Sequence, residues 1–276
     1  MKFETHTLQK PLKEHIESIF HYKGFQPDHS IERVVPTGHI FILFELDGIL
    51  RNTFDNKTLE PNGTFTKAWV SGMHKEFLSI SAHQDSETLV IQFKPAGALL
   101  FFRLPIHQLN NKVIAAQEIF DDEILQLRKQ ILKQPTAREK FDLVESWLLE
   151  IMDLSKKPPQ EIVTILDKFQ KNSFQEHQKI VQSYSKTQKH LIGQFKKYVG
   201  LTPKVIHRIF RFNEVLSNIH SNKKLDWSQI AYQFGYADQS HFIREFNEFS
   251  GFNPTQFIDA DFDKDEPNFF PLDRNG

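Results

Sequence analysis

The chain has 276 residues, of which 39% are hydrophobic and 25% charged, and its formal net charge is −1 at pH 7. This length and apolar content suit two domains with cores of their own. The sequence contains no cysteine, which excludes disulfide bonds, thiolate–zinc sites and thiol nucleophiles.

Short apolar runs alternate with turn residues between residues 31 and 93, a pattern typical of an antiparallel sheet or a small barrel. The run at 40–46 is apolar at nearly every position, as expected for a strand buried on both faces. The sequence therefore predicts an antiparallel β-rich, barrel-like (cupin-like) domain, with strands at 40–46, 65–70, 77–81 and 88–93.

Helical patterns follow the predicted sheet. Pro95 and Gly97 end the strand pattern, residues 98–102 resemble a buried helical turn, and amphipathic helices are predicted over 118–132 and 136–154. The acidic run 121–123 supplies negative charge at a helix start. Two apolar stripes either form a dimer surface or pack on the barrel: Ile124, Leu127 and Ile131, and Leu143, Trp147, Leu148 and Ile151.

The paired prolines in residues 156–159 predict a linker between domains. Beyond it, Thr187 is placed to cap a helix over 188–199 that Gly200 ends. Thr202 and Pro203 then start a longer helix that reaches about residue 219, because proline at the first helical position costs no hydrogen bond.

A second helix-turn-helix pattern occupies residues 227–246. Gly235 ends its first helix, since the turn requires a positive φ, and Asp238 is a suitable N-cap for the next helix. Apolar residues recur at helical spacing on both helices: Ile230, Ala231 and Phe234 on the first, and Phe242, Phe246 and Phe249 on the second.

These two units, each ending in Gly-x-x-Pro and joined by a helix, resemble the DNA-binding domain of AraC/XylS-type transcription regulators. The resemblance covers about residues 160–258 and rests on 195–204, 208–212, 230–242 and 251–254. The first unit departs from the family in two places: residues 182–186 lack the alanine and glycine usual there, and Gly193 stands where a long polar side chain is common. Gly193 either lets the helix approach the DNA backbone closely or, more simply, means that this unit reads less sequence. Residues 92–105 are also similar to the N-terminal domain of a subset of these regulators, whose ligand is not established.

The resemblance implies a sequence-specific transcription regulator that binds double-stranded DNA with two recognition helices in successive major grooves. We expect a sensor or dimerisation domain at 1–157, a DNA-binding domain at 158–260 and a flexible acidic tail at 261–276. The alternative for the tail is that residues 269–271, Phe-Phe-Pro, dock on the body of the protein. A small-molecule effector, a homodimer and RNA polymerase are the further partners implied. DNA contacts are expected from Lys186, Lys189, Ile192, Lys196 and Lys197 in the first unit, and from Gln239, Ser240, His241 and Arg244 in the second.

The charge distribution agrees with this division. Residues 158–260 contain 13 Lys and Arg against 9 Asp and Glu, residues 1–157 contain 19 against 21, and residues 261–276 contain 2 against 5. The positive excess coincides with the two units, where it favours contact with DNA phosphates. The cations gather around the first unit: Lys186, Lys189, Lys196, Lys197, Lys204, Arg208 and Arg211.

An enzymatic alternative is a metal- or sugar-modifying barrel fused to a DNA-targeting module. Its candidate ligands are His39, His74 and His83, which form no tight metal-binding pair in the sequence. Nucleophile-elbow, phosphate-loop and zinc-protease motifs are absent, so we expect no cofactor, no metal and no catalytic residue. No apolar run is long enough for a membrane span, and the expected location is the cytoplasm.

Overall fold

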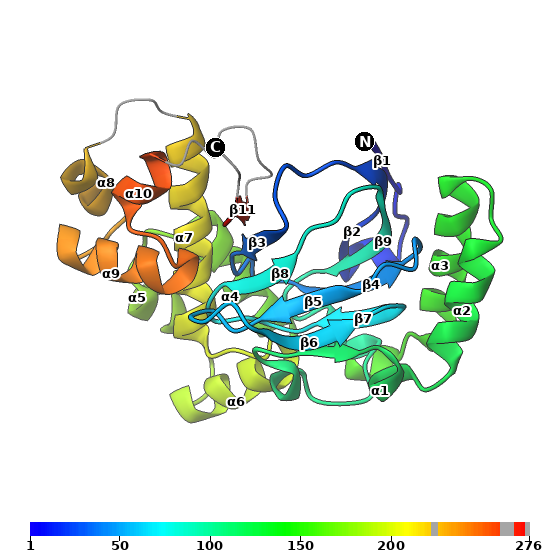
Figure 1. Cartoon of the computed structure of the whole chain (residues 1–276). Helices are drawn as coiled ribbons and strands as arrows, with labels where there is room; N and C mark the ends of the chain where they lie inside the picture. Colours follow the sequence, from blue (N-terminus) through cyan, green and yellow to red (C-terminus); the bar gives the residue numbers. More distant parts are fainter. Residues whose placement is uncertain (222–225, 260–267, 274–276) are drawn as a thin grey trace.

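The structure is a computed structural model that describes residues 1–221, 226–259 and 268–273. It confirms the predicted α+β class: strands of the first half form antiparallel sheets, helices trail them, and the C-terminal part is helical except for one short strand. Helices α2 (Glu123–Leu132) and α3 (Ala137–Ile151) lie at one side of the sheets, and helices α8 (Trp227–Gln233), α9 (Gln239–Ser250) and α10 (Pro254–Asp259) lie at the other (Figure 1). Helix α7 (Pro203–Ser221) lies between these three helices and the sheets. None of the described helices has the length and apolar character needed to cross a membrane.

The first sheet has six strands in the order β1-β2-β9-β4-β7-β10, and every neighbouring pair is antiparallel. The two longest strands, β2 and β9, are neighbours, and neither is an edge strand of this sheet. The bounds are β1 Lys2–Thr5, β2 Ile16–Phe25, β4 Ile40–Glu45, β7 Ala68–Ser71, β9 Ser86–Phe93 and β10 Val113–Ala115.

The second sheet has five strands in the order β11-β3-β8-β5-β6, again antiparallel. It faces the first sheet across a cavity whose lining both sheets supply, and the described strands do not close into a single barrel. The bounds are β3 Ile31–Val34, β5 Arg51–Phe54, β6 Pro61–Phe65, β8 Leu78–Ser81 and β11 Phe269–Pro271.

Alternation along β4 shows how the first sheet is covered. Ile42 and Phe44 belong to the main hydrophobic core, whereas Phe41 and Leu43 point to the cavity and are only partly buried. The strand is therefore apolar at nearly every position because one face packs in the core and the other lines the cavity. This corrects the expectation that both faces are packed in a core.

Short helices lie between strands of the sheets: η1 Leu12–Glu14, η2 Ala98–Leu100 and η3 Ile106–Leu109; a fourth, η4 Leu154–Lys156, precedes the C-terminal helices. Helices α1 Gln117–Phe120, α2 Glu123–Leu132 and α3 Ala137–Ile151 follow β10. The helix expected over 118–132 is broken at Asp121, whose φ is 53°. Thr136 caps α3 in a reciprocal capping box with Glu139.

Most residues of the two apolar stripes of α2 and α3 are buried within this chain. Ile124, Ile131 and Leu148 have no exposed area, and Leu127 and Trp147 belong to the same core cluster, whereas Leu143 and Ile151 are partly buried. Both helices thus pack on the sheet, as the second of the two hypotheses predicts, and the buried residues of the stripes are not available as a dimer surface.

Seven helices make up the C-terminal part: α4 Gln160–Lys171, α5 His177–Val181, α6 Gln188–Tyr198, α7 Pro203–Ser221, α8 Trp227–Gln233, α9 Gln239–Ser250 and α10 Pro254–Asp259. This count refers to residues 160–221 and 226–259. The helix predicted from Pro203 to about residue 219 is α7, and α4 starts directly after the paired prolines.

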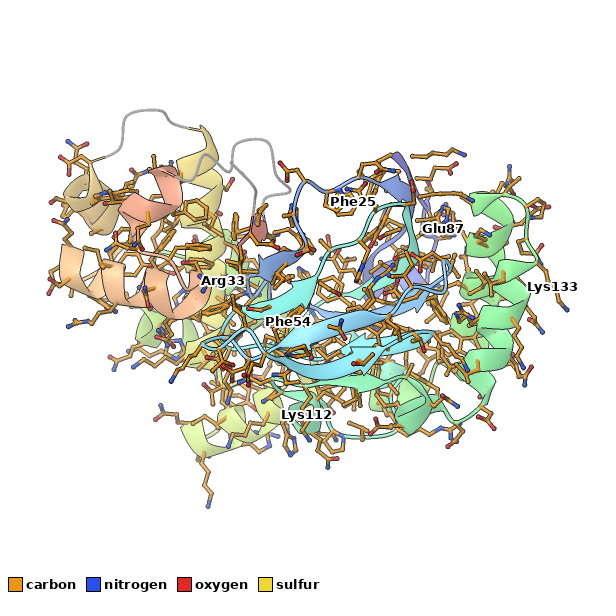
Figure 2. All side chains as sticks on the ribbon, viewed as in Figure 1. Phe25, Arg33, Phe54, Glu87, Lys112 and Lys133 are labelled. Atoms are coloured by element: carbon orange, nitrogen blue, oxygen red, sulfur yellow. The ribbon has the colours of Figure 1, made fainter. Side chains whose placement is uncertain are left out.

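Within the described part of the chain, side-chain hydrogen bonds join the C-terminal helices to the sheet part. Asn110 donates to the carbonyl of Gly200 (2.6 Å), Asn213 on α7 donates to that of Pro36 (3.0 Å), and Arg33 donates to that of Gly251 (2.8 Å). Figure 2 shows Arg33 where the sheets meet the C-terminal helices. The loop 35–39, which we call the β3–β4 loop, thus contacts α7 on one side and lines the cavity on the other.

The acidic tail departs from expectation. Residues 269–271 form β11, which pairs antiparallel with β3, and Phe270 is fully buried. Asp273 accepts hydrogen bonds from the amides of Ser30 (3.0 Å) and Ile31 (2.8 Å). The prediction of a flexible tail is therefore wrong for residues 268–273, while residues 260–267 and 274–276 lie outside the described part.

Candidate nucleic-acid interface

The second helix-turn-helix unit consists of α8, a short turn and α9. Asp226 caps α8 by accepting from the amides of Ser228 and Gln229, and Asp238 caps α9 by accepting from the amide of His241 (2.7 Å). Gly235 has a φ of +68°, a conformation that side-chain-bearing residues rarely adopt. These local signals in the sequence therefore correctly locate both helices and the turn.

Gln239, Ser240 and Arg244 are exposed on the N-terminal half of α9, and His241 is partly buried beside them. Within the described part of the chain, Arg244 has no ion pair or hydrogen bond. Gln239 accepts from the hydroxyl of Ser228 on α8 (2.9 Å), and the His241 ring accepts from the amide of Ala237 (3.4 Å). Arg244 and Ser240 are thus open to a partner, whereas Gln239 and His241 also tie α9 to α8 and the turn.

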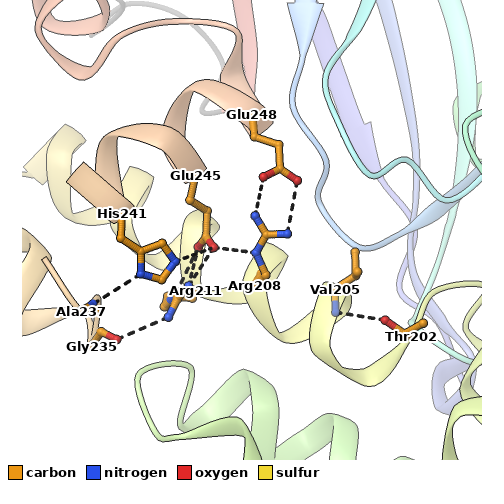
Figure 3. A network of polar contacts seen from close by, with 9 residues as sticks. All are labelled: Thr202, Val205, Arg208, Arg211, Gly235, Ala237, His241, Glu245 and Glu248. Carbon is orange, nitrogen blue, oxygen red and sulfur yellow. Dashed lines mark hydrogen bonds and ion pairs between the residues drawn. The ribbon is translucent and has the colours of Figure 1, made fainter. Parts of the chain in front are cut away.

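The opposite face of α9 is fixed to α7 by an ion-pair network (Figure 3). Glu245 is almost fully buried, and its carboxylate accepts from Arg208 (2.6 Å) and three times from Arg211 (2.7, 2.9 and 3.2 Å). Arg208 also makes a two-point contact with Glu248. Arg208 and Arg211, counted among the cations of the first unit, therefore lie against carboxylates of the second recognition helix.

The sequence-based reasoning missed this network. A signal was present, because Arg208 and Arg211 on α7 have the same i, i+3 spacing as Glu245 and Glu248 on α9. The guanidinium of Arg211 also lies 4.0 Å from the ring centre of Tyr236, which follows the turn glycine. The network therefore sets the position of both α9 and the turn relative to α7.

The first unit consists of α5 and α6. Thr187 caps α6 by accepting from the amide of His190, as the sequence predicts, and Gly200 after the helix has a φ of +95°. Lys186, Lys189, Lys196 and Lys197 are exposed, and Ile192 is partly buried. A Cβ built on Gly193 would have no heavy atom within 4 Å, so the glycine is a surface gap in the helix rather than a packing requirement.

The linker helix α7 connects the two units. Its 19 residues span about 28 Å at 1.5 Å per residue. Ile206, Ile209, Phe212 and Val215 have no exposed area, and α7 contacts α4, α6 and α9. Helix α7 therefore connects the two units through a buried apolar face.

The three histidines of the enzymatic alternative all line the cavity between the sheets, but each is bonded to a neighbour. His39 pairs with the Phe93 carbonyl (2.9 Å), His74 with the Ser71 hydroxyl (3.1 Å) and His83 with the Ser81 hydroxyl (2.8 Å). Burial lowers the pKa of all three, that of His74 to about 4. They do not gather into a ligand set; among the described residues that arrangement occurs at His6, Asp142 and Glu145.

Comparisons with known proteins cover both halves of the chain. Residues 4–115 match the family described as "Domain of unknown function (DUF6597)", and residues 180–260 match the family described as "Helix-turn-helix domain". A comparison with curated proteins gives no match.

Solved structures of ToxT from Vibrio cholerae are similar to the whole chain. One is 12% identical with a TM-score of 0.45, covering 94% of this chain and 98% of ToxT. Another, of wild-type ToxT with an unsaturated fatty acid bound, is 13% identical with a TM-score of 0.43, covering 87% and 93%. These values are too low to carry a function from ToxT to this chain. The helix-turn-helix match and the pair of capped units together place residues 180–260 in the family of helix-turn-helix domains, of the AraC type.

Proposed function

We propose that this chain is a sequence-specific transcription regulator, not an enzyme, that binds double-stranded DNA with α6 and α9 in successive major grooves. The observation that carries the proposal is the pair of exposed helix N-terminal halves attached to one buried linker helix. The length of α7, about 28 Å, approaches the roughly 34 Å of one DNA turn. The two domains of the proposal are residues 1–157 and residues 158–260, of which residue 260 lies outside the part that the structure describes.

Each recognition helix has a distinct role in this proposal. Arg244, exposed and long, suits a bidentate contact with guanine, and Ser240 suits a phosphate. Gln239 and His241 position α9: Gln239 keeps its amide nitrogen for the duplex, whereas Nε2 of His241 lies 3.9 Å from the Glu245 carboxylate. Around α6 the contacts are mainly to phosphates, through Lys186, Lys189, Lys196 and Lys197, with Ile192 against a thymine methyl group.

The N-terminal domain is proposed to sense a small molecule in the cavity between its sheets. The cavity has a volume of about 280 Å³, close to the lower end of ligand pockets. The β3–β4 loop lines it and also packs on α7, where Pro36 accepts from Asn213. Occupancy of the cavity can thus act on the helix that holds both recognition helices.

Homodimerisation remains part of the proposal, on a surface other than the buried stripes. The outer faces of α2 and α3 expose Leu132 and Leu149 by 43% and 44%. A dimer would bring two DNA-binding domains to repeated half-sites and raise affinity through effective concentration. Sedimentation of the full chain at micromolar concentration tests it, and a monomer both with and without DNA contradicts it.

Selection of bound duplexes from a random DNA pool tests the central proposal. The full chain should enrich a defined sequence, protect two adjacent major grooves on one face, and lose affinity steeply with added salt. Enrichment of no sequence would contradict sequence-specific binding. Protection of a single groove would show that α6 does not dock.

A further inference from the structure

The cavity between the two sheets is an unusual feature for a sandwich core. Protein interiors are normally close-packed, with few voids larger than one water molecule. Here about 280 Å³ stays open, although the walls are mostly apolar. The first sheet contributes Phe41, Leu43 and Trp69 to the walls, and the second contributes Val34, Leu78 and Ile80. An apolar body of small size therefore fits this space.

One part of the cavity wall is polar, at Glu45 and Arg51. Glu45 is almost fully buried and accepts from the indole of Trp69 (2.7 Å) and the hydroxyl of Thr88 (2.9 Å). Nη2 of Arg51 lies 2.9 Å from Glu45 and 2.5 Å from Asp47. Nη1 of Arg51 is buried too, yet it has no hydrogen-bond partner among the described residues. A buried guanidinium nitrogen without an acceptor is costly, so an acceptor on a ligand would stabilise it.

The charges at this end are already paired. Arg51 pairs with the carboxylates of Glu45 and Asp47, and Arg128 donates to the backbone carbonyl of Glu45 (2.7 Å). A ligand carboxylate would compete with two like charges for one guanidinium, and a ligand cation would have to displace Arg51 from its two carboxylates. The remaining titratable wall groups are Glu32, which pairs with His29 (3.1 Å), Tyr22, and the three histidines, whose pKa burial lowers.

We propose that the cavity binds an uncharged small molecule with an apolar body and an oxygen acceptor that takes the free Nη1 hydrogen bond of Arg51. This inference rests on the proposed role of the N-terminal domain as a small-molecule sensor. It names the chemical class that the sensor recognises and the residue that selects it.

A matched pair of fluorescent probes tests the inference on the full chain. One is an acetyl-(dimethylamino)naphthalene, which is uncharged and carries a ketone acceptor; the other replaces the acetyl group with a carboxylate. The ketone should bind at least roughly tenfold more tightly, with a blue-shifted emission, because the carboxylate meets paired acids. Arg51→Lys, which keeps the charge and loses Nη1, should weaken ketone binding roughly tenfold.

Leu43→Trp, which fills the cavity, should abolish ketone binding, whereas Leu154→Trp, at an exposed position outside the cavity lining, should leave it unchanged. Equal or tighter binding of the carboxylate probe, or no binding of either probe to the parent, overturns the inference. If a variant does not fold, the probe pair on the parent still decides. Affinity for the selected DNA, measured without probe, reports separately on the DNA-binding proposal, so the two can fail independently.

Discussion

Arg211 on the linker helix donates to both carboxylate oxygens of Glu245 on the second recognition helix, at 2.7 and 2.9 Å. The Glu245 side chain has no exposed area, so its charge depends on Arg211 and Arg208 for compensation. Because both cations belong to α7, the orientation of α9 is set by a buried polar contact and not only by apolar packing. The consequences can be measured at this pair.

Replacing Glu245 by alanine should destabilise the chain strongly. The substitution leaves two half-buried guanidinium groups without their partner, and breaking a buried pair costs about 3–5 kcal/mol. Glu248→Ala is the matched control on the same helix, because that carboxylate is half exposed and should contribute only about 0–1 kcal/mol. Urea unfolding of both variants checks the difference. Similar losses in the two variants would show that burial of Glu245 does not govern its contribution.

Arg244→Ala should weaken binding to the selected DNA while leaving stability unchanged. The side chain is exposed and has no partner among the described residues, so its removal leaves no group uncompensated. Loss of a bidentate guanine contact corresponds to about 1–3 kcal/mol of discrimination. Gel-shift titration against the selected site and a single-base variant measures it, with thermal unfolding as control. Exposed Tyr232 on α8 provides a comparison variant, Tyr232→Ala. Unchanged affinity of Arg244→Ala for the selected site would remove Arg244 from the reading face.

The helix-turn-helix units were predictable because their signals are local. The N-caps Thr187 and Asp238 and the left-handed Gly235 each act within one turn of the chain. Contacts between distant elements were not predictable. Arg208 and Glu245 are brought together only when α7 packs on α9, so a count of charges along the chain misassigns Arg208 to the first unit.

Strand β2 illustrates the same limit for the fold. Its register with β9 shifts twice, and its two faces meet the core and the cavity. The sequence 16–25 therefore lacks a regular polar and apolar alternation, and no strand was predicted there. The strand β11 in the tail is comparable, since its partner β3 lies more than two hundred residues earlier in the chain.

Gly193→Ala should stabilise the protein by about 0.5–1 kcal/mol, because a mid-helix glycine costs that amount relative to alanine and the new methyl group meets no atom within 4 Å. Gly97→Ala should have the opposite effect, since its Cβ would lie 2.0 Å from the His15 carbonyl oxygen. Chemical unfolding compares the two. The affinity of Gly193→Ala for the selected DNA is a second measurement. If it equals that of the parent, α6 does not need the glycine for close approach to the duplex.

Stability should fall as the pH decreases from about 6.5 towards 4, in part through His207. The ring is buried, stacks on Phe169 with centres 4.6 Å apart, and has its pKa lowered to about 4 by burial and by His177 and Arg211 nearby. In this window the unfolded chain binds a proton that the folded chain does not, so the free energy of unfolding decreases as pH falls.

His207→Phe keeps the aromatic stacking and removes this proton site. The loss of stability between pH 7 and pH 5 should shrink by about 1–2 kcal/mol relative to the parent. The other buried histidines leave a residual slope in both proteins. His107→Phe, at an exposed position, controls for the added phenylalanine. Parallel stability curves for the parent and His207→Phe would exclude His207 as a source of the pH dependence.

Phe270→Ala should release β11 from β3. Phe270 is fully buried, and its ring meets that of Phe257 edge-on with centres 4.8 Å apart. Truncation should therefore lower the free energy of unfolding by about 3 kcal/mol, and the loss is no larger than the whole contribution of β11 to stability. Phe269→Ala is the neighbouring control, because that ring is 37% exposed.

Release of β11 would also free the Val35 amide, which donates to the Asn268 carbonyl (3.1 Å). Hydrogen exchange at Val35 should therefore accelerate only in Phe270→Ala. Since Val35 begins the β3–β4 loop, the same variant should change affinity for the selected DNA if that loop couples the cavity to α7. Unaltered exchange at Val35 would mean that β11 stays paired without its buried ring, and that the backbone ladder with β3 and the Asp273 contacts suffice to hold the tail.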